Sequence, residues 1–290
     1  MKNLSDIGEV RRILSRHGFH VSKAMGQNFL VNPTVCPRMA EESGLTKTTG
    51  VLEIGPGIGV LTRELALRAG KVAAIELDKR LPEVLAETLD DFDNVKIIPG
   101  DVLKLDLHQL LAEEFAEMEK IAVCANLPYY ITSPVIMKLL EEKLPVETIT
   151  VMVQKEAAER ICAAPGSRAC GAVSVAVQYY AEPEILFGVG RNSFLPPPNV
   201  DSAVMRLTIR QKPPVELGSV TEDQFFKVVH AAFLQRRKTV RNSLSAGLSM
   251  GKDQVETALA AAAIPETARA EQLTMEQFGA LAKALFGKGD

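Results

Sequence analysis

The chain has 290 residues, of which 47% are hydrophobic and 24% charged, and its net charge is −3. This length allows one large core and a small second domain, and the composition is ordinary for a soluble globular protein. No apolar run approaches about 18 residues, so no membrane span is expected. The charged N-terminus lacks the apolar segment of a signal peptide, so the expected location is cytoplasmic.

The cysteines and histidines do not suggest a metal site or a disulfide framework. None of Cys36, Cys124, Cys162 and Cys170 forms a C-x-x-C pair, and they are expected to be small core residues. His17 and His20 have no acidic or thiol ligand near them in sequence. The sequence therefore predicts that no metal is bound.

Positive charge is concentrated in two places. Residues 1–30 carry five Lys or Arg against two Asp or Glu, and residues 190–245 carry nine against four. The rest of the chain is acidic. Such a distribution is compatible with a nucleic-acid partner even though the overall charge is negative.

The first predicted element is a helix that ends at Gly18, with Ile7, Val10, Ile13 and Leu14 on one face. From residue 50 the sequence alternates between β-branched runs and helix-like runs. The strands are predicted at 50–55, 71–78, 94–101 and 120–130, and the helices at 59–70, 79–92, 105–119 and 133–143. This alternation predicts βαβ units, in which helices cover both faces of a parallel sheet.

Three further strands are predicted at 148–156, 172–189 and 201–211, before a proline-bearing break. The remaining runs, 221–248, 252–264 and 274–287, are typical of helices. We therefore expect an α/β domain over residues 1–212 and a small all-α domain over residues 213–290.

Polar groups follow three successive predicted strands. Gly55, Gly57 and Gly59 form a tight turn before a helix, in an E-x-G-x-G-x-G pattern that begins at Glu53. Glu76 ends the second strand, where an acid can accept both hydroxyls of a ribose. Asp101 ends the third, where it can accept a hydrogen bond from an adenine amino group. Together they predict a site for an adenosine-bearing cofactor at the carboxyl edge of the sheet.

The fourth strand ends in Asn126-Leu127-Pro128-Tyr129. With the preceding elements, this motif resembles the S-adenosylmethionine-dependent methyltransferases that act on exocyclic amino groups. The resemblance implies that the Asn126 side chain and the Leu127 carbonyl accept hydrogen bonds from an adenine N6 amino group. By the same resemblance, Asn126 also borders the cofactor. It also implies that Pro128 fixes the turn and that Tyr129 stacks on the base.

Three more stretches, 23–33, 194–207 and 233–244, resemble the small-subunit ribosomal RNA adenine dimethyltransferases of the KsgA/RsmA type. In that family the Q-N-F-L segment closes over the methionine part of the cofactor, which implicates Asn28 and Leu30. The ring of Phe194, the first residue of an F-x-P-x-P-x-V-x-S motif, is expected to help hold the adenine. The implied reaction dimethylates N6 of two adjacent adenosines near the 3′ end of 16S rRNA, within the immature small subunit.

Cys170 departs from the family, which usually has tyrosine there. We place this residue in a loop near the substrate entrance, so its contact with RNA is in question. The related 23S rRNA adenine methyltransferases of macrolide resistance are one alternative, and a non-catalytic RNA- or DNA-binding relative is another.

The run from Phe226 to Leu244 is expected to be a helix that faces RNA. Its predicted buried face consists of Phe226, Val229, Phe233, Val240 and Leu244. Its predicted phosphate contacts are Arg236, Arg237, Lys238 and Arg241. A monomer is expected.

Overall fold

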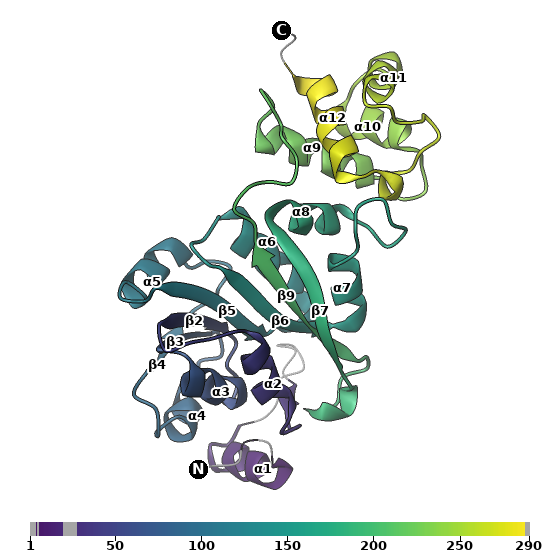
Figure 1. Cartoon of the computed structure of the whole chain (residues 1–290). Helices are drawn as coiled ribbons and strands as arrows, with labels where there is room; N and C mark the ends of the chain where they lie inside the picture. Colours follow the sequence, from purple (N-terminus) through teal and green to yellow (C-terminus); the bar gives the residue numbers. More distant parts are fainter. Residues whose placement is uncertain (1–3, 5, 20–27, 288–290) are drawn as a thin grey trace. The chain divides into compact units, whose positions relative to one another are not determined.

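The computed structural model describes residue 4, residues 6–19 and residues 28–287, and the chain divides into two compact units (Figure 1). The first, which we call the sheet unit, comprises Met1–Ala158 and Glu184–Ile209. The second, the helical unit, comprises Glu159–Pro183 and Arg210–Asp290. A single boundary near residue 212 is too simple a description, because the helical unit also takes in the segment 159–183.

A mixed sheet of seven strands, in the order β4-β3-β2-β5-β6-β9-β7, forms the centre of the fold. The strands are β2 (Thr49–Ile54), β3 (Lys71–Glu76), β4 (Val95–Pro99), β5 (Lys120–Asn126), β6 (Thr148–Gln154), β7 (Ala181–Val189) and β9 (Ser202–Ile209). The five from β4 to β6 are parallel, and β9 is antiparallel to β6. The strand order reverses between β2 and β5, and ligands of such sheets bind at the carboxyl ends beside this point.

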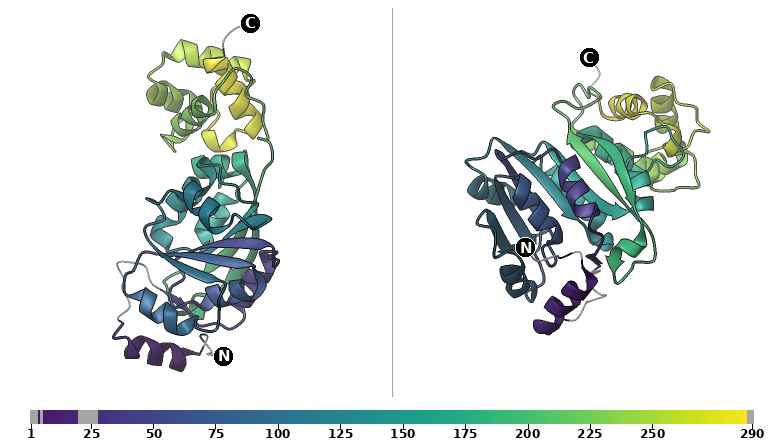
Figure 2. Two further views of the ribbon diagram at one scale, coloured as in Figure 1. Left: turned by 90° about the vertical axis from the view of Figure 1, so that its left-hand side faces the viewer. Right: turned by 60° about the horizontal axis from the view of Figure 1, so that its bottom comes forward.

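Helices flank the sheet on both sides (Figure 2). They are α1 (Ile7–Arg16), α2 (Val35–Glu42), α3 (Val60–Arg68), α4 (Leu81–Thr88), α5 (Leu107–Glu114) and α6 (Thr132–Glu141), and α7 (Lys155–Ile161) directly follows β6. Helices α2 and α3 share one apolar cluster with residues of β2, β3 and β5. The predicted α/β architecture is confirmed.

The predicted N-terminal helix forms as α1, and Asp6 caps it by accepting a hydrogen bond from the Glu9 N–H at 2.8 Å. Val10, Ile13 and Leu14 are buried as predicted, in a cluster with residues of α4. Ile7 is 43% exposed, so its place on the buried face was predicted wrongly. It lies in the first turn, at the end of the apolar stripe.

The helical unit is built from α8 (Ala172–Tyr180), α9 (Glu222–Phe233), α10 (Val240–Leu248), α11 (Lys252–Ala261) and α12 (Met275–Phe286). These helices share one apolar core. In this core the rings of Tyr179 and Phe225 stack, with their centroids 5.1 Å apart. Capping boxes begin α9 at Thr221 and α12 at Thr274. These caps satisfy backbone N–H groups that the first turn of a helix leaves unpaired.

The prediction of strand over residues 172–180 is wrong, because these residues form α8. Alternating valines at 173, 175 and 177 are typical of a strand. In the structure every residue from Ser174 to Val177 is buried, and a helix buried all round shows no 3.6-residue pattern. The Gly171 N–H donates to Ser174 Oγ at 2.9 Å and fixes the start of the helix.

The prediction of one helix from residue 221 to residue 248 is also wrong, because α9 ends at Phe233 and α10 begins at Val240. Between them the Lys238 N–H donates to the Gln235 carbonyl at 2.9 Å, closing a turn. Thr239 caps α10 by accepting from the Asn242 N–H. Of the predicted buried face, three residues are buried and two are partly buried: Val229, Val240 and Leu244, and Phe226 and Phe233, respectively.

Candidate functional site

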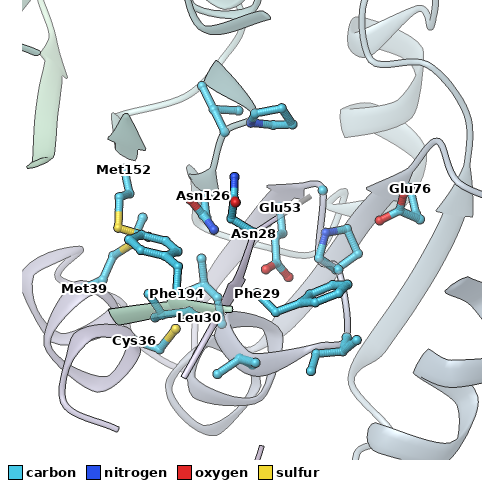
Figure 3. Close-up of a pocket in the computed structure, with 18 of the residues that line it drawn as sticks. Asn28, Phe29, Leu30, Cys36, Met39, Glu53, Glu76, Asn126, Met152 and Phe194 are labelled. Atoms are coloured by element: carbon cyan, nitrogen blue, oxygen red, sulfur yellow. The ribbon is translucent and has the colours of Figure 1, made fainter. Parts of the chain in front are cut away.

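A cavity opens at the carboxyl ends of the parallel strands in the sheet unit (Figure 3). Nine residues predicted for the site line it: Asn28, Leu30, Gly55, Gly57, Glu76, Asn126, Leu127, Tyr129 and Phe194. They come from five separate stretches of the chain. Parallel strands place their carboxyl ends at one edge, which brings three of these stretches together.

The glycine-rich turn between β2 and α3 forms one wall of the cavity. Gly55, Gly57 and Gly59 all have positive φ, at 71°, 59° and 88°. Residues with a side chain rarely adopt a positive φ, whereas glycine does so readily. At Gly55 there is also open space, because an added Cβ would meet no atom within 4 Å. The backbone of Gly55 therefore lies open to a ligand, just before the N-terminus of α3.

Glu76, the last residue of β3, is 7% exposed and lines the cavity. Its Oε1 accepts a hydrogen bond from the Asp78 N–H at 2.7 Å. Burial raises the pKa of Glu76, and backbone hydrogen bonds from Asp78 and Gly57 oppose that shift. The carboxyl group is thus oriented by the turn that follows its own strand.

Asp101 follows β4, which pairs with β3 so that Glu76 lies opposite Pro99. It does not line this cavity. Its carboxylate accepts from the Leu103 N–H at 3.0 Å and lies 3.6 Å from the Lys104 amino group. The structure brings Asp101 to the predicted edge of the sheet, but its side chain is engaged in its own turn.

The motif Asn126-Leu127-Pro128-Tyr129 forms the end of β5 and the start of a short 3₁₀ helix, Tyr129–Ile131. Leu127 is buried, and its N–H donates to the Met152 carbonyl at 3.1 Å. The Tyr129 hydroxyl lies 2.8 Å from Ser202 Oγ, and Ser202 itself is fully buried. Since Ser202 closes the F-x-P-x-P-x-V-x-S motif, this hydrogen bond joins two motifs that are far apart in sequence.

The predicted Q-N-F-L segment is the third motif, and a two-stranded sheet holds it at the same wall of the cavity. Strands β1 (Phe29–Leu30) and β8 (Phe194–Leu195) are antiparallel, with Leu30 opposite Phe194. The Val31 N–H donates to the Ser193 carbonyl at 2.8 Å and extends the pairing. Asn28, immediately before β1, and Asn126 both line the cavity. The rest of the predicted segment, 23–27, lies outside the described residues.

Sequence reasoning assigned no role to Glu53, the first residue of the glycine motif. It is 1% exposed and lines the cavity. Burial raises the pKa of Glu53 to about 8, Thr62 opposes the shift, and the charge of Glu76 adds to it. The E-x-G-x-G-x-G spacing was the available signal, but the burial of this carboxyl group depends on the folded environment.

Three sulfur-containing side chains, also missed as site residues, belong to the apolar part of the cavity wall. Cys36 and Met39 come from α2 and Met152 from β6. Burial raises the pKa of the Cys36 thiol, so it is protonated and unreactive at neutral pH. Cys36, Cys124 and Cys170 are buried, as predicted for core cysteines, whereas Cys162 is only partly buried.

The predicted RNA-binding residues lie in the helical unit and fall into two groups. Arg236, Arg237 and Lys238 are exposed in the turn between α9 and α10, which we call the basic turn (235–239). Arg241, in the first turn of α10, is bound by the carboxylates of Glu256 at 2.7 Å and Glu266 at 2.9 Å. The structure thus presents three of the four cations to solvent and neutralises the fourth.

Cys170 is only 7% exposed and belongs to the apolar core of the helical unit. The loop position predicted for it precedes α8, but its side chain faces inward. Burial raises the pKa of its thiol to about 11. The Cys170 side chain therefore belongs to the core of this unit rather than to an exposed surface.

No group of three or more His, Cys, Asp or Glu residues among those that the structure describes could hold a metal ion. None of the helices described is both long and apolar enough to cross a membrane.

The seven-stranded mixed sheet, the glycine turn after β2 and the acid that ends β3 define a class I methyltransferase fold. The 23S rRNA methyltransferase ErmE has a similar structure, with a TM-score of 0.67 and 31% identity over 89% of this chain and 99% of that one. A dimethyladenosine transferase from Plasmodium falciparum shares the fold, with a TM-score of 0.68 and 24% identity over 87% and 95% of the two chains.

Sequence comparison narrows the class to one family. The family model for Ribosomal RNA adenine dimethylase matches residues 18–286. The chain is 50% identical to the Ribosomal RNA small subunit methyltransferase A of Geobacillus thermodenitrificans, over 98% of this chain and 97% of that protein. It is 48% identical to the protein of that name from Shouchella clausii, over 98% and 96%. The chain belongs to the ribosomal RNA adenine dimethylase family.

Proposed function

We propose that the protein transfers methyl groups from S-adenosyl-L-methionine to N6 of two adjacent adenosines near the 3′ end of 16S rRNA. Each adenosine is dimethylated, and the substrate is the immature small ribosomal subunit in the cytoplasm. Identity to small-subunit enzymes reaches 50% over nearly the whole chain, against 31% to the 23S enzyme ErmE. This difference favours the small subunit over the 23S alternative.

The observation that carries the proposal is the joining of three motifs around one cavity. Tyr129 is bonded to Ser202, and Leu30 lies opposite Phe194. Asn126 and the glycine turn line the same cavity as these contacts. A non-catalytic relative has no need for all of these groups in one arrangement, which supports an enzyme.

The residues present fit the cofactor. Gly55 leaves open space above its backbone, and Glu76 offers a buried carboxyl group of the kind that accepts ribose hydroxyls. Asn28 and Leu30 would border its methionine part. When bound, the cofactor supplies a methyl group on a cationic sulfur. We keep Asp101 as a proposed contact to the adenine, from the strand beside Glu76.

The amine is prepared by residues of the chain. The Asn126 side-chain oxygen and the Leu127 carbonyl accept hydrogen bonds from N6, which turns its lone pair out of conjugation with the ring. Tyr129 and Phe194 hold the ring by its faces, and the Tyr129–Ser202 hydrogen bond fixes one of these rings. Alignment supplies most of the catalysis, because the methyl donor is already activated. The methylated amine then loses its proton to water.

The target adenosines must leave their stack to enter such a cavity. The basic turn offers phosphate contacts for RNA, since Arg236, Arg237 and Lys238 are all exposed. Arg241 is held by two carboxylates, so we assign it a weaker part than its neighbours. We expect the protein to act as a monomer and without a metal.

Radiolabelled methyl transfer to purified subunits tests the proposal. Unmethylated small subunits, methylated small subunits and large subunits are each incubated with the protein and labelled S-adenosyl-L-methionine. The proposal predicts about four methyl groups for each unmethylated small subunit, two on each adenosine, and none for the other substrates. Label on large subunits or on free 23S rRNA would support the 23S alternative, and no label on any substrate would support the non-catalytic one.

A further inference from the structure

Glu53 is the most unusual charged group in the sheet unit. Its side chain is 1% exposed, and its Oε2 has no hydrogen-bond partner among the described residues. Figure 3 shows its carboxyl group at the cavity wall, among Asn28, Phe29 and Asn126. A buried carboxyl group with an unpaired oxygen is costly, because burial disfavours the ionised form.

The surroundings of Glu53 offer no compensating positive charge. Glu76 at the end of β3 raises the pKa of Glu53, and the Thr62 side chain on α3 lowers it. The charge of Glu53 in turn raises the pKa values of Cys36 on α2 and Cys124 on β5. Among the described residues that line the cavity there is no Lys, Arg or His. Burial and the negative charge of Glu76 therefore both favour the neutral acid, and the pKa of Glu53 rises to about 8.

A glutamine in this place would fill the same space without the penalty of a buried charge. A carboxyl group is useful here only if a positive charge enters the cavity, because a nearby cation favours ionisation. S-adenosyl-L-methionine carries two positive charges, an ammonium and a sulfonium, so this step rests on the proposed function.

We propose that Glu53 exchanges its proton for the cofactor: it is a neutral acid in the empty cavity and a carboxylate beside the bound cation. Each binding event then releases one proton from Glu53 to the buffer. The only bond broken is the O–H bond of the Glu53 carboxyl group. The positive charge that leaves with the proton is replaced by a positive charge of the ligand. Cofactor binding thus becomes coupled to pH.

Isothermal titration calorimetry of the full chain at pH 6.5, in buffers of different ionisation enthalpy, counts the protons directly. At this pH the ammonium of the ligand is itself protonated, because α-amino groups titrate at about 7.7–8.0. We expect close to one proton released for each S-adenosyl-L-methionine bound, and an affinity that rises about tenfold from pH 6 to pH 7. Release of no protons by the wild-type protein would overturn the inference, and this measurement needs no variant.

Variants identify the source of the proton. Glu53→Gln is expected to bind with no proton release and no change of affinity between pH 6 and pH 7. Glu76→Gln, which removes the other buried acid of the cavity, is expected to keep the release. If Glu76→Gln lost the release and Glu53→Gln kept it, Glu53 would be excluded.

Two ligand analogues distinguish the effect of the ammonium from that of the sulfonium. The same measurements distinguish failure of the Glu53 inference from failure of the proposed function. S-adenosylhomocysteine keeps the ammonium but not the sulfonium, and 5′-methylthioadenosine has neither. Proton release with S-adenosylhomocysteine would assign the ammonium to Glu53, and its absence would assign the sulfonium. Release with 5′-methylthioadenosine would overturn the inference. Binding of S-adenosyl-L-methionine without proton release leaves the proposed function standing, whereas no binding at all would overturn both.

Discussion

The cavity of the sheet unit and the basic turn of the helical unit differ in how far their charged groups are exposed to water. In the cavity, Glu53 and Glu76 are buried, and their pKa values are raised by removal from water. In the basic turn, Arg236, Arg237 and Lys238 remain exposed. A buried acidic group can interact only with a ligand small enough to enter the cavity. An exposed basic group can bind a long polyanion, and salt weakens that interaction. Changes in one region should therefore leave the function of the other intact.

The largest effect is expected from Asn126→Ala. Turnover should fall about a hundredfold or more, since the lost contact matters chiefly when N6 becomes nucleophilic. Binding of small subunits should change little. Single-turnover methyl transfer and calorimetry measure the two separately, and a near-normal rate would remove Asn126 from the chemistry.

Glu53→Gln is expected to stabilise the protein without cofactor, in a pH-dependent way. The folded-state pKa of Glu53, about 8, lies above its ordinary value of 4.5, so the wild-type protein loses stability as pH rises between these values. At pH 8 the variant should be more stable by about 4 kcal/mol, and the gain should disappear near pH 4.5. Urea unfolding at several pH values measures this difference.

The exposed Glu147, which pairs with Lys120 at 3.0 Å, provides a matched control for Glu53. Glu147→Gln should show no such dependence on pH. An equal or smaller gain for Glu53→Gln at pH 8 than at pH 5 would mean that Glu53 is not held neutral by burial.

The strand ends that form the cavity could be predicted from the sequence. Gly55, Glu76 and Asn126 each follow an apolar run, and parallel topology alone brings such ends together. The state of Glu53 could not be predicted, because it depends on burial and on Glu76 and Thr62, which approach it only in the folded chain.

The helical unit was harder to predict for similar reasons. Buried on all sides, α8 shows no helical period, and its alternating valines imitate a strand. The pairing of Arg241 with Glu256 and Glu266 joins residues from different segments, so a count of charges along the chain could not reveal it.

Asp101→Ala tests the proposed cofactor contact of Asp101, which does not line the cavity. If Asp101 accepts the adenine amino group, the variant should lose about 1–3 kcal/mol of cofactor affinity. Lys104→Ala is the control, since it removes only the neighbour 3.6 Å away. Unchanged binding by a folded Asp101→Ala protein would show that the carboxylate serves its own turn alone.

Tyr129 separates stacking from hydrogen bonding. Tyr129→Ala should weaken capture of the target adenosine by about 1–3 kcal/mol through lost stacking. Tyr129→Phe keeps the ring and loses only the hydrogen bond to Ser202, so its loss should be nearer 1 kcal/mol. The apparent affinity for unmethylated small subunits in single-turnover reactions measures both. Equal losses would indicate that the hydroxyl, rather than the ring, is needed.

The smallest effect is expected in salt dependence. Arg236→Glu with Arg237→Glu should weaken binding to immature small subunits, and each lost phosphate contact should lower the slope of log affinity against log salt by about 0.7–0.9. Arg241→Gln, whose wild-type side chain is already paired, should change the slope much less. Cofactor binding should stay the same in both. Normal subunit binding by the double variant at every salt concentration would make the basic turn an ordinary surface.

The central claim is that the cavity dimethylates two adjacent adenosines of the small subunit. Mass spectrometry of 16S rRNA fragments, after incubation of unmethylated small subunits with the protein and S-adenosyl-L-methionine, tests it at the level of single bases. We predict two neighbouring N6,N6-dimethyladenosines near the 3′ end with the wild-type protein, and none with Asn126→Ala. Methylation at any other base, or an unmodified 3′ end with the wild-type protein, would contradict the account.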